Sequence, residues 1–371
     1  MSSHLHVRCT AAELREALSE VTPAIPSRTT LPALECVHLH AEDNTLALTA
    51  TNLDLRISAR CPATVPEAGK ALVPARLFWD IVRSLEKEEE VSLRTEGTTV
   101  VLETSYGRYS LSGLAPEEFP AADNPPPATV ELSPDILRQI VQHVLFAVSE
   151  EPIRLALTGV LWEFRSDALF AVATDGYRLS RLRVDFNSPQ QGSLLIPADT
   201  VELLRRIDSP VHVGWDEGSV SFSTPTLTIV GRLIAERFPA YEQVIPTENP
   251  RRCIIDRERF LRALERVSLF SPSQARIVRF HFAEGGVTLR AEDESRGDRA
   301  QEVVSCSWSG EELTIGFNAS YLSEALKAAQ HNELLLEFSE PTKPVVIRWA
   351  EAAELPVLQS PLVILVMPVR L

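Results

Sequence analysis

The stretch SPDILRQIVQHV, residues 133–144, has the pattern of an amphipathic helix, and the chain carries this pattern twice more. The other copies are TAAELREALSEV at residues 10–21 and DRERFLRALERV at residues 256–267. Each copy begins with a residue that favours the N-cap of a helix, and successive copies start 123 residues apart. An internal repeat of this length predicts three structural units of one kind.

The apolar residues of the three copies repeat together with their caps. They fall four, seven, eight and eleven positions after the cap, which is the spacing of one buried helix face. The predicted core residues are Leu14, Ala17, Leu18 and Val21; Leu137, Ile140, Val141 and Val144; and Phe260, Ala263, Leu264 and Val267. Twelve matching positions at one period favour a structural repeat over chance.

A second helix repeats in the same way, and strands lie between the helices. It begins as PARLFWDIVRSL at Pro74, PADTVELLRRI at Pro197 and NASYLSEALKA at Asn318, at offsets of 123 and 121 residues. Alternating runs such as TTVVLETSYGRYSLSG (98–113) and SVSFSTPTLTIVGRL (219–233) are typical of antiparallel strands. The sequence therefore predicts an α+β fold made of three tandem two-helix, antiparallel-sheet domains.

Two linkers separate these domains. AADNPPPATVE (121–131) is rich in proline, and IPTENPRR (245–252) is polar and contains two prolines. A chain of 371 residues is also longer than one hydrophobic core usually supports. We expect domains at residues 1–124, 125–248 and 249–371.

Composition narrows the class of protein. The chain is 44% hydrophobic and 23% charged, which is typical of a globular protein. Its five cysteines are scattered without a C-x-x-C pair, so we expect free thiols. The start lacks a basic region followed by an apolar run, and the apolar run that ends the chain is too short to cross a bilayer, so we expect no membrane partner and a cytoplasmic protein.

The distribution of cations matters more than the net charge. A net charge of −15 argues against binding to nucleic acid. Nine positions after the start of each second helix, however, a cation lies opposite the core face: Arg83, Arg206 and Lys327. Arg76 is close to that face. On the first helices, Arg15 and Arg138 share one position. The third repeat has Leu261 there instead, with four arginines nearby: Arg257, Arg259, Arg262 and Arg266.

These cations have two interpretations. Most charged helix faces are simply solvated. If the helices line one concave surface, the cations would instead form a basic track that contacts DNA phosphates without reading sequence, and binding would be sensitive to salt. Asp199 and Glu202 would weaken the track in the middle repeat.

Four sequence blocks resemble one known family. They are SRTTLPALECVHLHAEDNTLALTATNLDLRISA (27–59), FAVATDGYRLSRL (170–182), FPAYEQVIP (238–246) and VMPVRL (366–371). Together with the three repeats they resemble the bacterial DNA polymerase III beta subunit, the sliding clamp family, over nearly the whole chain. The resemblance implies a head-to-tail homodimer whose six domains close into a ring around double-stranded DNA, with helices inside and sheets outside.

The resemblance also implies a hydrophobic pocket for short peptides from the DNA polymerase III alpha subunit, the clamp loader, other clamp-binding polymerases and repair proteins. Carried over by motif, its residues are Leu157, Thr174, Gly176, Tyr177, Arg178, Leu179, Pro239, Val244, Leu365, Met367, Pro368, Val369, Arg370 and Leu371. Arg28 matches a DNA-contacting position of the family, and Tyr109, Leu111, Leu269 and Phe270 match interface positions. We expect residues 362–366 to form the last strand of the third domain and keep the site interpretation for the residues that follow.

Other functions have weaker support. No Walker loop, G-x-G-x-x-G, H-E-x-x-H or G-x-S-x-G motif occurs, so we expect neither an enzyme nor a cofactor. The pairs His4 with His6 and His38 with His40 alternate as strand neighbours do, and we expect no metal site. Asp175 could serve a cytosolic hydrolase together with a histidine, but Asp-Gly more often forms a turn. A second alternative is a specialised clamp paralogue that binds peptides and encircles DNA weakly.

Overall fold

The computed structural model of the protein describes residues 4–121, 124–272 and 276–371. Residues 122–123, which belong to the first predicted linker, lie outside this description. The chain divides into two compact units, Met1–Leu132 with Ser209–Leu233, and Ser133–Asp208 with Ile234–Leu371. The middle repeat contributes strands to both units, and the domain limits at residues 124 and 248 stay a prediction.

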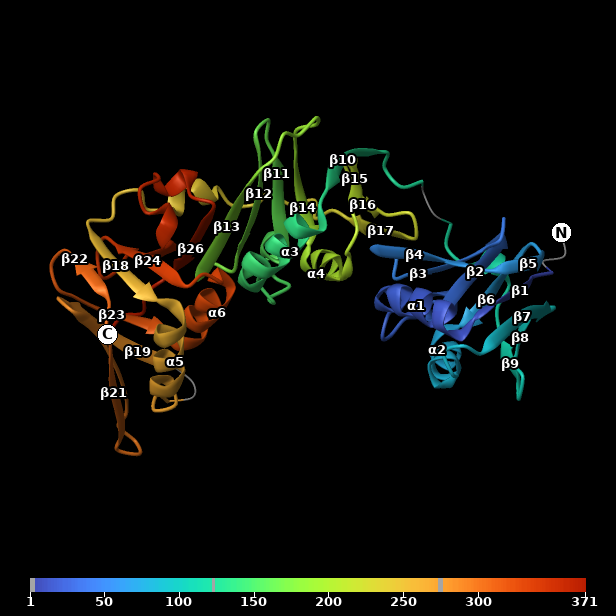
Figure 1. Ribbon diagram of the computed structural model, residues 1–371, viewed down its shortest axis with the longest axis horizontal. Coiled ribbons are helices and arrows are strands. Elements are labelled where there is room, and N and C mark those ends of the chain that lie inside the picture. Colours follow the sequence, from blue (N-terminus) through green and yellow to red (C-terminus); the bar gives the residue numbers. More distant parts are fainter. Residues whose placement is uncertain (1–3, 122–123, 273–275) are drawn as a thin grey trace. The chain divides into compact units, whose positions relative to one another are not determined.

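The helices begin at the predicted residues. Within the described ranges there are six α-helices: α1 (Ala11–Val21), α2 (Ala75–Ser84), α3 (Pro134–His143), α4 (Ala198–Leu203), α5 (Arg257–Ser268) and α6 (Ala319–Ala329). The side chains of Thr10, Ser133 and Asp256 accept hydrogen bonds from N–H groups in the first turns of α1, α3 and α5. All twelve predicted core residues are buried, which confirms the repeat. Helix α1 packs beside α2, and α5 packs beside α6 (Figure 1).

Helix α4 departs from the expected pattern. It ends at Leu203, and Leu204–Arg206 continue as a 3-10 turn. The β-branched Thr200 and Val201 favour a helix less than most residues do, and Pro210 follows soon after the turn. Arg206 therefore lies on a 3-10 turn and not on the α-helical face predicted for it.

In its described residues, the first unit contains two antiparallel sheets. One has five strands in the order β5-β1-β7-β8-β9, and the other has eight in the order β10-β15-β16-β17-β4-β3-β2-β6. The strands are β1 (His6–Thr10), β2 (Cys36–Glu42), β3 (Thr45–Thr51), β4 (Leu55–Pro62), β5 (Thr64–Glu67), β6 (Gly69–Pro74), β7 (Glu90–Glu96), β8 (Thr99–Glu103), β9 (Arg108–Ser112), β10 (Ala128–Leu132), β15 (Val211–Trp215), β16 (Ser219–Ser223) and β17 (Leu227–Arg232). Strand β17 pairs with β4, so the sheets of the first and middle repeats are continuous.

The part of the second unit that the structure describes also contains two antiparallel sheets. One has nine strands in the order β14-β11-β12-β13-β26-β25-β24-β18-β22, and the other has four in the order β21-β20-β19-β23. The strands are β11 (Gly159–Phe164), β12 (Ala168–Thr174), β13 (Arg178–Asp185), β14 (Gly192–Pro197), β18 (Arg251–Asp256), β19 (Ile277–Ala283), β20 (Gly286–Asp293), β21 (Asp298–Val304), β22 (Ser307–Ser309), β23 (Leu313–Asn318), β24 (Glu333–Phe338), β25 (Val345–Trp349) and β26 (Leu362–Val366). Strand β13 pairs with β26, which joins the middle repeat to the third.

Two buried arginines hold the chain that leads into β26. Arg181 of β13 donates to the carbonyl oxygens of Leu358 and Ser360, each at 2.9 Å. Arg348 of β25 forms an ion pair with the carboxylate of Glu337 at 2.8 Å, and both side chains are buried. Arg348 also donates to the carbonyl oxygens of Ala352 and Leu355, each at 3.0 Å. Buried polar groups are costly without hydrogen bonds, so the contacts of the two arginines to these carbonyls fix the approach to β26.

The last residues of the chain are held by backbone hydrogen bonds. Leu362–Val366 form a fully buried strand, as one interpretation of the sequence expected. Beyond it, the N–H of Met367 donates to the carbonyl of Tyr177 at 2.8 Å, and the N–H of Val369 donates to that of Gly316 at 2.9 Å. We call residues 367–371 the tail. In the described part of the chain, no helix is long and apolar enough to span a bilayer.

Gly316 leaves room for the tail. A Cβ atom at this position would lie 2.6 Å from Cδ2 of Leu371 and 3.1 Å from Cγ2 of Val369. Such distances require the tail to shift, because side-chain carbons do not approach so closely. The missing side chain of Gly316 thus fixes where the tail lies on β23.

We predict that Gly316→Val releases the end of the tail from β23 because the added methyl groups occupy the space of Leu371. Carboxypeptidase should remove the terminal residues of this variant several-fold faster than those of the unchanged protein. Thr314→Val is the matched control, since Thr314 is exposed and lies two residues earlier on the same face of the strand. Equal rates of digestion for the two variants would show that the tail does not depend on Gly316.

Candidate functional site

Residues 174–178 form a tight turn between β12 and β13. The carboxylate of Asp175 accepts hydrogen bonds from the N–H groups of Tyr177 at 2.8 Å and Arg178 at 2.9 Å. Gly176 has a φ of +92°, which few other residues adopt. The hydroxyl of Thr174 donates to the carbonyl of Arg178 at 2.7 Å. The turn interpretation of Asp175 is confirmed, and its carboxylate is occupied in holding the turn.

Side chains of helix α6 anchor this turn. Arg178 forms ion pairs with Asp175 at 3.0 Å and with Glu324, and its guanidinium lies 4.9 Å from the centre of the Tyr321 ring. Tyr177 stacks on Tyr321 with ring centres 5.7 Å apart. Partial burial and the Asp175 carboxylate raise the pKa of Tyr321, which therefore stays neutral at physiological pH. The turn of the middle repeat is thereby fixed to the third.

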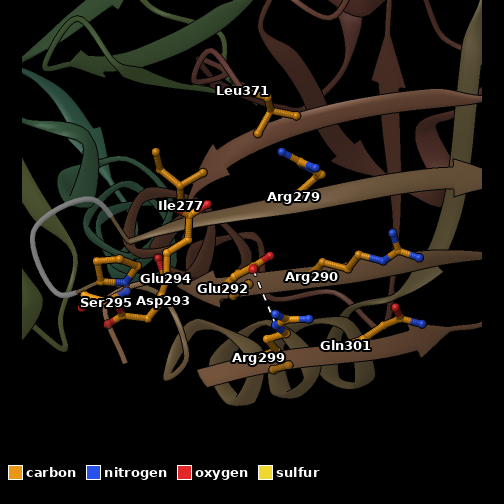
Figure 2. A pocket seen from close by; sticks show the side chains of 14 residues that line it. Ile277, Arg279, Arg290, Glu292, Asp293, Glu294, Ser295, Arg299, Gln301 and Leu371 are labelled. Atoms are coloured by element: carbon orange, nitrogen blue, oxygen red, sulfur yellow. Dashed lines mark hydrogen bonds and ion pairs between the residues drawn. The ribbon is translucent and has the colours of Figure 1, made fainter. Parts of the chain in front are cut away.

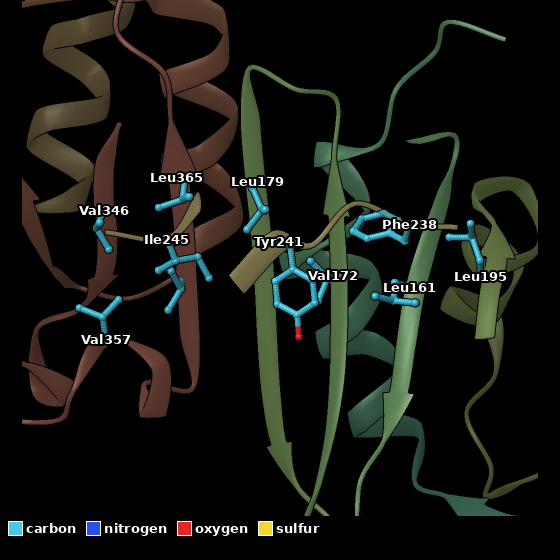
Figure 3. Close-up of a cluster of buried hydrophobic side chains, with 11 residues drawn as sticks. Leu161, Val172, Leu179, Leu195, Phe238, Tyr241, Ile245, Val346, Val357 and Leu365 are labelled. Atoms are coloured by element: carbon cyan, nitrogen blue, oxygen red, sulfur yellow. The ribbon is translucent and has the colours of Figure 1, made fainter. Parts of the chain in front are cut away.

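A buried apolar cluster lies beneath the turn and the tail. Figure 3 shows Leu179 and Leu365 on the paired strands β13 and β26, with Tyr241 and Ile245 close by. The remaining buried members are Leu161, Val172, Leu195, Phe238, Val346, Val357 and Val363. We call this buried apolar cluster the floor of the site, because any ligand bound here would lie on top of it.

Apolar side chains around the floor are unusually open to solvent. The exposed fractions are 57% for Tyr177, 57% for Val244 and 40% for Met367. Pro239 is exposed as well, whereas Leu157, at the end of a 3-10 turn, is buried. Exposed apolar surface over a firm floor is typical of a binding site for a partner.

The structure brings most of the predicted pocket residues together, but the residues of the tail lie in two different places. Met367 lies beside the 174–178 turn, whereas Val369 and Leu371 lie on β23. Leu371 lines a second cavity, which is described below. No hydrogen bond or ion pair between described residues involves the side chain of Arg370, which is exposed.

Several residues of this region were not predicted from the sequence. Tyr241 donates from its hydroxyl to the Glu163 carboxylate at 2.7 Å, and burial raises its pKa. Leu155 is 45% exposed and lies two residues before Leu157. No sequence pattern pointed to Tyr321, because its role depends on contact between two repeats. Phe238 could have been found, since Phe119 occupies a corresponding position at the end of the first repeat.

The predicted DNA-facing cations differ in their environment. Arg15 is half-buried and donates to the carbonyl oxygens of Val82 at 3.3 Å and Leu85, so it closes the C-terminal end of α2. Arg83 pairs with Asp80 at 3.0 Å, Lys327 pairs with Glu265 at 2.8 Å, and Arg138 pairs with Asp135. Arg28, Arg76 and Arg206 are exposed, and no ion pair within the described ranges involves them.

The four predicted interface residues also differ. Leu111 is only 1% exposed within its own chain and cannot offer side-chain surface to a partner. Tyr109 is half-buried on β9, an edge strand of the five-stranded sheet. Leu269 and Phe270, just after α5, are 81% and 40% exposed. Of these positions, Leu269 and Phe270 offer the most apolar surface.

In the part of the chain that the structure describes, histidine and cysteine side chains do not gather into a metal site. Among the described residues, no three His, Cys, Asp or Glu side chains could hold an ion together. His38 stacks on Phe119 with ring centres 5.2 Å apart, and burial lowers its pKa to about 4. The five cysteines are free thiols, as expected.

Three family models match the chain in succession. They describe the N-terminal, central and C-terminal domains of the DNA polymerase III beta subunit, and they match residues 5–123, 131–240 and 242–362. The matched ranges follow the three repeats in order.

Named relatives and solved structures agree with these matches. A beta sliding clamp of Synechococcus elongatus is 31% identical over 352 residues, which is 91% of this chain and 94% of the relative. That of Escherichia coli K12 is 28% identical and covers 90% of this chain and 93% of its own. The crystal structure of a Pseudomonas aeruginosa sliding clamp bound to griselimycin superposes with a TM-score of 0.93 at 26% identity, covering 99% of this chain and 100% of that one.

The repeats, the order of the sheets and the matches over almost the whole length thus lead to one conclusion. The chain belongs to the DNA polymerase III beta subunit family, the sliding clamps.

Proposed function

We propose that two copies of this chain close head to tail into a ring around double-stranded DNA and tether the replicative polymerase to it in the cytoplasm. The alpha subunit of DNA polymerase III, the clamp loader, and other polymerases and repair proteins would take turns at one pocket. The ring acts by topology, so it needs neither a catalytic residue nor a cofactor. The observation that carries the proposal is the exposed apolar site built from the 174–178 turn, the 238–245 segment and the tail.

The apolar site suits short peptides that exchange. Burial of two apolar anchors contributes roughly 1.5 to 3 kcal/mol each, and each hydrogen bond adds about 1 kcal/mol. After the cost of ordering the peptide, a dissociation constant of about micromolar, near −8 kcal/mol, is expected. Met367 is a suitable wall because its flexible thioether adapts to different side chains.

The cations fit a ring that holds DNA loosely. Arg83, Arg138 and Lys327 are already paired with carboxylates, and such exposed pairs are weak enough to exchange an acid for a phosphate. Arg28, Arg76 and Arg206 are exposed and free to contact phosphates directly. Contacts of this kind position DNA without reading its sequence, as a sliding ring requires.

A labelled peptide that carries Gln and a Leu-Phe pair should bind the protein with about micromolar affinity, measured by fluorescence anisotropy. Removal of residues 367–371 should abolish binding, and Met367→Ser should weaken it roughly 5- to 30-fold because one apolar wall is lost. Leu77→Ser is the control, because Leu77 is 51% exposed on α2. Undiminished binding by the truncated protein would place the partner site elsewhere.

A closed dimer predicts a solution mass of twice 41.1 kDa, that is 82.2 kDa, by light scattering at micromolar concentration. Replacing Leu269 and Phe270 with Asp should yield monomers, because two charges would be buried unpaired in the interface. Leu355→Asp, at a side chain that is 43% exposed, should leave the mass unchanged. A monomeric unchanged protein would contradict the ring.

Charge reversal of Arg83, Arg206 and Lys327 to Glu should weaken binding to duplex DNA at low salt. The plot of log affinity against log salt should lose a slope of roughly 0.9 for each lost phosphate contact. Reversal of Arg60, Arg237 and Lys343, which are exposed and lie outside the helices, makes the same change in net charge. If both triple variants behave alike, the helix cations are merely solvated and the peptide-binding paralogue becomes the better description.

A further inference from the structure

Two arginines lie directly opposite each other in the four-stranded sheet. Arg279 of β19 pairs with Arg290 of β20, and Arg290 pairs with Gln301 of β21. On its other side Arg279 pairs with Gly316 of β23. Residues opposite each other on adjacent strands point to the same face of a sheet, so the four form one row across it. Figure 2 shows Arg279, Arg290 and Gln301 on successive strands.

The charges of this pair are not neutralised by neighbours. Like charges directly opposite each other repel, so the arrangement costs stability unless something compensates it. Within the described ranges, no hydrogen bond or ion pair involves either side chain, and both are exposed. Of the nearby acids, Glu292 pairs with Arg299 at 3.6 Å and Asp293 with Arg296 at 3.8 Å, while Glu294 lies at the hairpin end of the cavity. In a chain of net charge −15, two free adjacent arginines form a distinct cationic spot.

The arginine pair lines a cavity that the tail also reaches. The cavity has a volume of about 1040 Å³, and its lining includes Arg279, Arg290, Gln301, Ile277 and Leu371. Figure 2 shows Leu371 near Arg279 and the Glu292–Arg299 contact at the opposite side. The lining also contains Glu294, at the hairpin end of the cavity. The row of paired residues is therefore its cationic part.

The distance from the tail to the arginines is short. Val369 bonds to Gly316, which starts the row. Adjacent strands are about 4.8 Å apart, so Arg290 lies roughly 10 Å from Gly316. An extended peptide covers about 3.3 Å per residue. A chain docked at the tail would thus reach the arginines within roughly three to five residues.

We propose that Arg279 and Arg290 bind acidic residues that flank the apolar motif of a docked partner peptide. The inference rests on the proposed function, because it extends the same site along the sheet. Guanidinium groups favour carboxylates through paired, charge-assisted hydrogen bonds. The arrangement selects partners whose docking segment carries acidic residues three to five positions from its apolar anchors.

Duplex DNA is the less favoured occupant. The opposite face of this sheet carries the buried Val278, Phe280 and Leu289, against which α5 packs. The arginines therefore point away from α5, which packs beside α6, the helix on which Lys327 was predicted to face DNA. An anionic group that reaches them binds on the face of the sheet where the cavity also contacts Leu371.

The test compares three labelled peptides that share the Gln and Leu-Phe core. One has neutral flanks, one carries two Glu residues three to five positions before the core, and one carries them after it. At low salt, one of the two acidic peptides should bind roughly three- to tenfold more tightly than the neutral peptide. Added salt should remove this difference in affinity. In the double variant Arg279→Gln with Arg290→Gln, the acidic peptide should bind no more tightly than the neutral one. The affinity for the neutral peptide should stay the same.

Arg8→Gln with Arg60→Gln is the matched control, since both residues are exposed on the strands β1 and β4 and the net charge changes equally. Equal affinities of all three peptides for the unchanged protein would overturn this inference and leave the pocket intact. Failure of every peptide to bind would instead remove the proposed function. Loss of duplex DNA binding in the 279/290 variant, with the control unaffected, would assign the arginines to DNA.

Discussion

The pairing of β13 with β26 is the interaction on which the candidate site depends. It sets Leu179 opposite Leu365 and so joins the sheets of two repeats in a single register. Slippage by one residue would turn every buried side chain of β26 to the other face. Arg181 opposes such slippage, because its two buried terminal NH2 groups donate to the carbonyl oxygens of Leu358 and Ser360, and a shift would break these hydrogen bonds. The positions of the apolar floor, the turn and the tail all depend on this register.

The sequence predicts the helices well because their signal is local. A capping residue and four apolar positions specify where each of the first helices starts and which side it buries. The repeat provides three copies of this pattern, which can be compared with one another. The end of α4 was less predictable, because the competition between an α-helical and a 3-10 turn is decided by small differences. Arg206 was misplaced on the helix for that reason.

Long-range contacts limited what could be predicted of the site. Arg15 has the sequence spacing of an outward-facing cation, yet it reaches the carbonyl groups at the end of α2, which depends on how two helices pack. Leu111 matches an interface position by motif but is buried in its own sheet. Tyr321 supports the 174–178 turn from another repeat. A residue whose role is set by a neighbour far along the chain leaves no periodic pattern to detect.

The contrast between the two halves of the C-terminal segment gives the site its character. Strand β26 is buried and lies between β13 and β25, with residues 364–366 paired on both sides. The tail has single backbone contacts to Tyr177 and Gly316, and Met367 is 40% exposed. A strand held on both edges cannot adapt without breaking its ladder, whereas a segment held at two points can shift its side chains at little cost. Rigid support beneath an adaptable edge lets one surface accept different apolar anchors, while charged groups at its margin distinguish among their flanks.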